Sequence, residues 1–266
     1  MSRNDVNWTP ARVAPRLGFW RRVGRSIGRV FGARYYDGGK ASSRFREFST
    51  RTGGPNAITE AMGRNLRNRA RDMVRNDPHC SRAVATLVNN IVGTGITATA
   101  SAPGEKPDPI AVKRAALANA LWLAHGLRGV CDVEGQHTRD ALIAIAIRGL
   151  VESGEVLVRR VIDRAAGRVP YRYEVLEADL LDESKNGTAA AGGQIVQGVE
   201  FDVRGRRVAY WLLPEHPGEA TQWRSVSLVS VRVPAADIIH LFVPGRPKQA
   251  RGIPFLSPIL AAKRDL

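Results

Sequence analysis

The most suggestive serine in this sequence lies in "GRSIG", at residues 24–28. The segment matches the G-x-S-x-G pattern, which presents a serine nucleophile, here Ser26, on a sharp turn. That chemistry needs a buried strand before the serine and a helix after it. Ser26 is instead flanked by arginine-rich sequence. We therefore expect Ser26 to be inert, and we expect that the chain is not an enzyme.

The sequence does not predict a metal or cofactor site. The "GTG" at residues 93–95 follows a predicted helix and lacks the third glycine of a dinucleotide-binding loop. The histidines share no metal-ligand spacing with one another or with the cysteines. They are His79, His125, His137, His216 and His240. We expect no cofactor, no metal and no small-molecule substrate.

Three further features have a chemical and a structural interpretation. Asp132 and Glu134 in "DVEG" are close enough in sequence for paired acid–base work, but we favour a loop that caps the next helix. His240 lies in an apolar, strand-like run and is expected to be a hydrogen-bonded core histidine. Cys80 and Cys131 fit a reducing compartment as small buried residues, rather than a disulfide framework.

The elements that would position these residues begin with helices. Helical patterns run from Ile58 to Asn76, from Asp77-Pro78 to the glycines at 93–95, from Asp108-Pro109 to Gly126, and from Thr138 to Gly154. Asp77 has the character of an N-cap, and Pro78 suits the first helical position. In the second helix one face is apolar, formed by Val84, Leu87, Val88 and Ile91.

The second half of the chain is strand-like. A hairpin is predicted around a turn at residues 165–167, and another around Arg204-Gly205. "SVSLVSVRVP" and "DIIHLFVP" supply two more strands. Helices followed by antiparallel hairpins predict an α+β fold rather than an alternating α/β fold.

The charge of the chain is concentrated at its front. The 266 residues carry a formal net charge of +15, and residues 1–75 hold 17 Lys and Arg against 5 Asp and Glu, which is +12. Residues 1–56 are interpreted as a basic, disordered arm, with the α+β domain at 57–256. Basic termini commonly bind nucleic acid or anionic membrane surfaces, and the alternative is a solvated tail. The arginines proposed to contact nucleic acid are Arg21, Arg22, Arg25 and Arg29.

Part of the arm has another interpretation. Residues 17–31 space their apolar side chains roughly along one helix face, so a basic amphipathic helix could form on a membrane or partner. No run of about 18 apolar residues predicts a membrane span.

Four blocks in the same order resemble the lambda family of bacteriophage portal proteins. They are "RARDMVRNDPHCSRAVATLVNNIVGTGI", "DVEGQHTRDALIAIAIRGLVESGEVLVRR", "QGVEFDVRGRRVAYWLL" and "VPAADIIHLFVPGRPKQARGIPFLSPIL". Together they span about residues 69–260, and the arm before residue 60 matches only in being basic.

The resemblance implies a structural role. Portal proteins form dodecameric rings at one capsid vertex, through which double-stranded DNA is packaged and ejected. Their partners include the large subunit of terminase, which hydrolyses ATP, and the head-completion and capsid proteins. Localisation at the portal vertex of a virion would follow, with the host bacterial cytoplasm as the place of assembly. Within this role, a polar, proline-rich loop with Arg246, Lys248, Gln249 and Arg251 has two interpretations. It contacts a neighbouring subunit or DNA, or it is a solvated loop.

Two other classes of function are alternatives. A nucleic-acid-binding protein would act through the basic arm, but this function does not explain the rest of the chain, which is nearly neutral. An enzyme would need a nucleophile–base pair or a metal cluster.

The last stretch, residues 257–266, is interpreted as the start of a longer helix. Ser257 would be its N-cap, and Pro258 would occupy its first position. Because no closing Gly or Asn follows, we expect an incomplete portal subunit that, alone, is monomeric or heterogeneous.

Overall fold

The computed structural model describes residues 52–104, 106, 108–164, 169–219, 225 and 227–260. Apart from Thr52, these residues all belong to one unit, Gly53–Leu266. Ser26, the amphipathic stretch at 17–31 and the four arm arginines lie outside the described residues. No described helix is long and apolar enough to cross a membrane.

Helices come first along the unit and strands follow, so the predicted α+β fold is confirmed. The helices are α2 (Pro55–Asn76), α3 (Pro78–Val92), α4 (Pro109–His125) and α5 (Arg139–Ser153). The strands are β1 (Glu155–Ile162), β2 (Tyr171–Glu177), β3 (Gly187–Thr188), β4 (Gln194–Val196), β5 (Val199–Phe201), β6 (Arg207–Leu212), β7 (Val231–Pro234) and β8 (Ile238–Phe242).

The helix ends are set by local chemistry. The Asp77 carboxylate accepts hydrogen bonds from the backbone of His79 and Cys80, and the Thr138 hydroxyl accepts one from Ala141. The predicted N-cap at Asp77 and the predicted start of the fourth helix near Thr138 are confirmed. Gly154 ends α5 with a φ of 84°, and a Cβ there would lie 2.1 Å from the carbonyl carbon of Ile253. Only glycine fits this position, because both the backbone conformation and the space exclude a side chain.

The strands form two antiparallel sheets, one in the order β2-β1-β8 and one in the order β3-β4-β5-β6-β7. The predicted second hairpin contains three strands rather than two. Gln197 and Gly198, both with positive φ, make an extra turn between β4 and β5. The expected turn near Arg204-Gly205 is present between β5 and β6.

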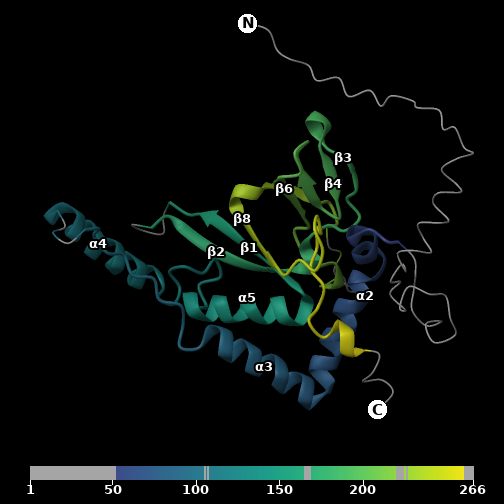
Figure 1. The fold of residues 1–266 in the computed structure, drawn as a ribbon, viewed down its shortest axis with the longest axis horizontal. Coiled ribbons are helices and arrows are strands. Elements are labelled where there is room, and N and C mark those ends of the chain that lie inside the picture. The colour runs from purple at the N-terminus through teal and green to yellow at the C-terminus, as the bar shows by residue number, and fades with distance from the viewer. Residues whose placement is uncertain are drawn as a thin grey trace, which may run out of the picture. The chain divides into compact units, whose positions relative to one another are not determined.

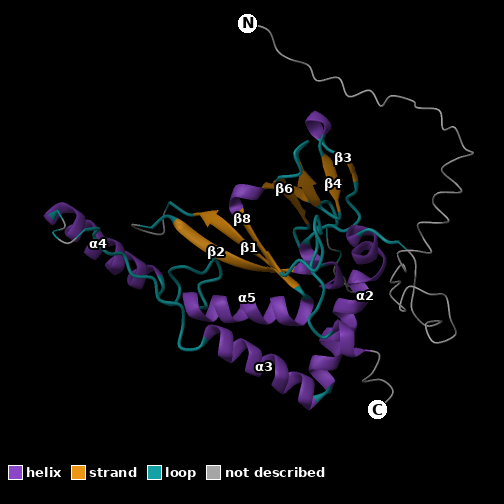
Figure 2. Ribbon diagram, viewed as in Figure 1, coloured by secondary structure: helices purple, strands orange, loops and turns teal. Residues whose placement is uncertain are grey.

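Helix α5 packs against the three-stranded sheet, and α3 packs against α5 (Figure 2). One apolar core lies between the two sheets and includes Leu157, Val199, Tyr210 and Ile238. A second core joins α2, α3 and α5 around Val74, Val84 and Val151. Of the expected apolar face of α3, Val84 is buried, whereas Leu87 and Ile91 are about half exposed.

One detail of the last described residues differs from the expectation. Ser257–Ile259 form a 3₁₀ turn that leads into a helical Leu260, and Leu256 rather than Ser257 occupies the position before the turn. The longer helix expected here stays a prediction. The Ser257 hydroxyl has no hydrogen-bond partner among the described residues, so it does not cap a helix. Residues 261–266 lie outside the described part of the chain.

Candidate functional site

A buried ion network connects α2, the start of β1, β8 and the loop after β8. The Glu155 carboxylate is fully enclosed and accepts from Arg251 Nε at 2.8 Å and from the Gly252 amide at 2.7 Å. His240 Nε2 lies 3.0 Å from the same carboxylate, which confirms His240 as a hydrogen-bonded core histidine. Two guanidinium groups face Glu155, because Arg67 Nη1 also lies 3.7 Å away.

Each guanidinium group of this network faces at least one carboxylate. Arg67, buried in α2, forms ion pairs with Glu183 and Asp179, while Arg71 lies 3.2 Å from Glu177 and also binds Asp179. Pairing of this kind is required because an isolated buried charge costs several kcal/mol or more. The network therefore fixes the relative positions of α2, β1 and residues 177–183.

Burial alone would raise the pKa of Glu155. The charge of Arg251 and the hydrogen bond from His240 outweigh burial and hold that pKa well below its usual range. For His240, burial dominates and lowers the pKa, although Glu155 opposes the shift. The favoured state is thus a charged Glu155 beside a neutral His240.

The same network shapes the loop that follows β8. Arg251 donates to the carbonyls of Gln197 and Ala178 at 3.2 and 2.9 Å. The Gln249 side chain accepts from the amides of Gly245 and Arg246 and donates to the carbonyl of Arg251. Two of the four residues predicted to contact a neighbour or DNA, Gln249 and Arg251, are therefore buried within the unit and hold this loop in place.

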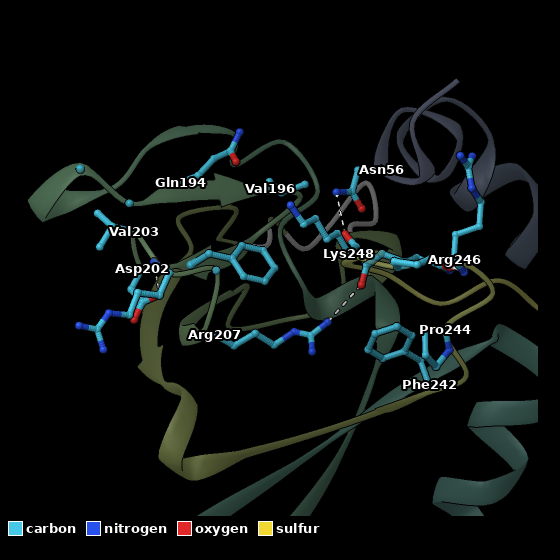
Figure 3. Close-up of a pocket in the computed structure, with 17 residues that line it drawn as sticks. Asn56, Gln194, Val196, Asp202, Val203, Arg207, Phe242, Pro244, Arg246 and Lys248 are labelled. Carbon is cyan, nitrogen blue, oxygen red and sulfur yellow. Dashed lines mark hydrogen bonds between the residues drawn. The ribbon is translucent and has the colours of Figure 1, made fainter. Parts of the chain in front are cut away.

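The other two, Arg246 and Lys248, are exposed on one wall of a basic pocket (Figure 3). The pocket has a volume of about 860 Å³, and its opposite wall is the β5–β6 turn. Four lining side chains are cationic and one is anionic. They are Arg204, Arg207, Arg246, Lys248 and the carboxylate Asp202.

Arg207 joins the two walls. Its guanidinium carbon lies 5.0 Å from the centre of the Phe242 ring, and the group donates to the carbonyls of Gln249 and Ala250 at 3.3 and 3.4 Å. Figure 3 shows the Arg207 side chain extending across the pocket toward the loop. Arg207 therefore has a mainly structural role, and the more exposed cations are Arg204, Arg246 and Lys248.

The backbone also constrains the loop wall. Lys248 has a φ of 62°, an unusual conformation for a residue with a side chain. Asn56 holds it there, donating to the Lys248 carbonyl at 3.2 Å and accepting from the Ala250 amide at 2.8 Å. On the other wall, the Asp202 carboxylate accepts hydrogen bonds from the Arg206 side chain and from the backbone amides of Arg204 and Arg206. The pocket is therefore a preformed, net positive surface suited to an anionic group.

Two clusters resemble chemical sites but have structural explanations. Glu177, Asp179 and His216 lie close enough to hold a metal ion, but the Arg71 guanidinium already lies against both carboxylates. Asp132 is buried, whereas Glu134 is exposed, so the two do not form an acid–base pair.

Asp132 instead organises the loop before α5. Its carboxylate accepts from the amides of Glu134, Gln136 and His137. Burial would raise the pKa of Asp132, and these donors lower it instead. The "DVEG" segment is therefore a structural loop, as favoured, but it does not itself cap α5, because Thr138 does.

Sequence reasoning missed Arg204 and Arg207 as members of the site. The local signal was present, because "RGRR" at residues 204–207 is strongly basic. No local pattern, however, connects this turn with a loop some forty residues later. The pairing depends on how β6 and β8 lie in the two sheets.

Comparison with known proteins gives two findings. The family described as phage portal protein, lambda family, matches residues 41–266. A protein named "Probable portal protein" from Halomonas phage phiHAP-1 is 32% identical over 191 residues, which are 70% of this chain and 36% of that protein. The chain thus spans about a third of the length of this relative.

Proposed function

Because the chain belongs to the lambda family of phage portal proteins, we propose that it forms the wing-containing part of a portal subunit. Copies would assemble into a ring at one vertex of the capsid, and double-stranded DNA would pass through the ring during packaging and ejection. The observation that carries this proposal is the family match over residues 41–266, which includes every described helix and strand.

The role of the chain in this proposal is mechanical rather than catalytic. The most enclosed ionisable groups, Glu155, Arg67 and Arg251, are used to hold elements together. ATP hydrolysis would belong to a terminase large subunit docked on the ring. Head-completion proteins would later replace the terminase there. The site of action would be the portal vertex of the virion, with assembly in the host cytoplasm.

The basic pocket supports a second function, non-specific binding of DNA. Arg204, Arg246 and Lys248 would contact phosphate groups, and the arginines of the arm would add further contacts. Phosphate contacts carry no sequence information, so binding would be independent of sequence and strongly weakened by salt. This agrees with the +12 charge of residues 1–75.

Labelling of phage particles tests the proposed function. An epitope tag would be added to the chain in the phage or prophage that encodes it, and particles would be labelled with antibody for electron microscopy. One labelled vertex per particle is expected, and particles formed without the chain should contain no DNA. Label spread over the whole shell, or DNA-filled particles in its absence, would contradict the proposal.

A further inference from the structure

Helix α4 and the segment before it form an arm that extends away from the layered body (Figure 1). The Asn119 side chain accepts from the Ala100 amide at 2.7 Å and donates to the Ala100 carbonyl at 3.0 Å. The extended segment therefore runs back along α4 and covers one side of it. No other described segment covers the remaining sides of the helix along its outer turns.

The arm is attached to the body through the last turn of α4. His125 Nε2 lies 2.8 Å from the Tyr171 carbonyl, and Arg139 donates to the Trp122 carbonyl at 2.7 Å while stacking on the Trp122 ring. Among the residues of α4, His125 alone is buried. The helix is thus held at a defined root, and its outer turns face solvent.

Those outer turns are apolar. Ile110 is 57% exposed and Leu117 52%, and the charged residues of α4 are Lys113 and Arg114. At the root, Leu123 is also 65% exposed. A helix that is apolar on most sides is normally buried, and soluble proteins seldom leave large contiguous apolar patches in water. The arm therefore has the composition of a buried helix, and most of its surface has no partner among the residues that the structure describes.

An apolar groove of about 390 Å³ lies at the root of the arm, between α5 and the β2-β1-β8 sheet. Its lining includes Ile143, Ile147, Val158, Val175, Ile239 and Leu241. Ile239 is 53% exposed on β8, the edge strand of that sheet. The groove is therefore accessible from outside.

We propose that the α4 arm of one copy docks into the groove of a second copy. This inference rests on the proposed function, since it identifies surfaces through which subunits of the ring would meet. The partner is a second copy because one chain carries both matching apolar surfaces. The arm cannot fill its own groove, because Trp122 and His125 line that groove and α4 leads away from it.

The length and the surface area of α4 bear on the choice of a second copy as the partner. At 1.5 Å per residue, Ile110 lies about 18 Å along the helix from Trp122, beyond the reach of its own groove. A helix of 17 residues is about 25 Å long and about 10 Å wide, with a lateral surface of roughly 800 Å² over all its sides. The preceding segment covers one of those sides, so the free sides are smaller than the roughly 800 Å² that a standard protein–protein interface buries on each partner. The arm would therefore supply a large part, but not all, of such an interface, and the rest would come from the surface around it.

The contact is heterologous, since arm and groove are different surfaces. Each copy gives its arm to one neighbour and accepts the arm of another, which generates a ring if the rotation closes and an open chain otherwise. A contact between two identical patches would instead stop at a dimer.

The test uses one substitution on each surface of the full chain. Leu117→Asp alters the arm and Ile239→Asp alters the groove, with Val229→Asp, at an exposed apolar position elsewhere, as the matched control. Size-exclusion chromatography with light scattering should show that the wild-type chain self-associates, unlike the monomeric or heterogeneous chain expected from the sequence. Each test variant should lose this self-association and the control should keep it, and a monomeric wild-type chain would overturn the inference. Circular dichroism and thermal melting should show that the variants remain folded.

Mixing the two defective variants gives the sharper outcome. The Leu117→Asp variant keeps an unaltered groove and the Ile239→Asp variant keeps an unaltered arm, so the mixture should form a one-to-one dimer and nothing larger. Self-association of Leu117→Asp at the wild-type level, or no dimer on mixing, would overturn the inference.

Crosslinking provides a readout that does not depend on the aspartates. Leu117→Cys and Ile239→Cys, placed on separate copies and treated with a short bismaleimide, should give a dimer only when mixed. Cys80 and Cys131 are buried, so the wild-type chain is the blank. No mixed dimer would overturn the docking, even if vertex labelling succeeds. A mixed dimer without vertex labelling would overturn the proposed function instead.

Discussion

Glu155 and Arg251 form a buried ion pair across 96 positions of sequence, with 2.8 Å between Arg251 Nε and Glu155 Oε1. Both side chains are almost completely inaccessible to solvent. The pair joins the first residue of β1 to the loop after β8, and that loop carries Arg246 and Lys248. The basic pocket therefore depends on a buried contact that does not line it.

Breaking this pair should destabilise the protein strongly. Arg251→Ala leaves Glu155 without its main counter-charge and should lower the free energy of unfolding by about 3–5 kcal/mol, measured by urea denaturation. The matched control is Arg159→Ala, which removes an exposed partner of Glu174 and should cost no more than about 1 kcal/mol. Equal losses in the two variants would contradict the buried pair's role.

Stability should fall as the pH is lowered from neutral, in two stages. The pKa of His240 is lowered in the folded protein, so the unfolded chain binds a proton more readily. Stability is therefore lost first as the pH falls below about 6.5, the ordinary histidine pKa. The pKa of Glu155 is also lowered, so its contribution is complete above about pH 4.3 and is lost below that value.

His240→Gln separates the two stages. Glutamine can still donate a hydrogen bond to Glu155 but does not titrate. Between about pH 7 and 5 the free energy of unfolding of this variant should change less than that of the wild type, as measured by urea denaturation at each pH. A variant with the wild-type pH dependence would show that His240 is not responsible for the first stage.

The loop wall of the basic pocket should contribute to DNA binding. Arg246→Ala with Lys248→Ala should weaken the binding of a duplex and reduce the slope of log affinity against log salt by about 2, if each cation neutralises one phosphate. Fluorescence anisotropy across a salt series measures both. Lys113→Ala with Arg114→Ala removes the same charge from α4 and should leave the slope nearly unchanged. An equal effect of the two pairs would indicate net charge rather than a site.

The arginines of the arm should contribute separately. Replacing Arg21, Arg22, Arg25 and Arg29 by Ala should lower the salt slope by up to about 4, without loss of stability in the α+β unit. The anisotropy assay and a thermal melt on the same samples check both statements. Binding unchanged by these substitutions would assign the affinity to the body of the chain.

Local sequence determined the elements and their order. Asp77 and Thr138 indicate helix starts, because a side-chain oxygen there can accept hydrogen bonds from backbone amides two or three residues further along. The hairpin turns and the charge of the first 75 residues are equally local. These features need no information from distant parts of the chain, so composition, spacing and order were enough to predict an α+β fold.

Tertiary structure decided where the elements meet. Strand β7 pairs with β6, whereas β8, only a few residues later, pairs with β1 in the other sheet. This pairing turns Arg251 inward to Glu155 and brings Arg204 and Lys248 to opposite walls of one pocket. The described part of the chain also leaves the apolar outer turns of α4 exposed. Burial, charge pairing and pocket shape depend on contacts between residues far apart in sequence, and no local pattern in the chain records them.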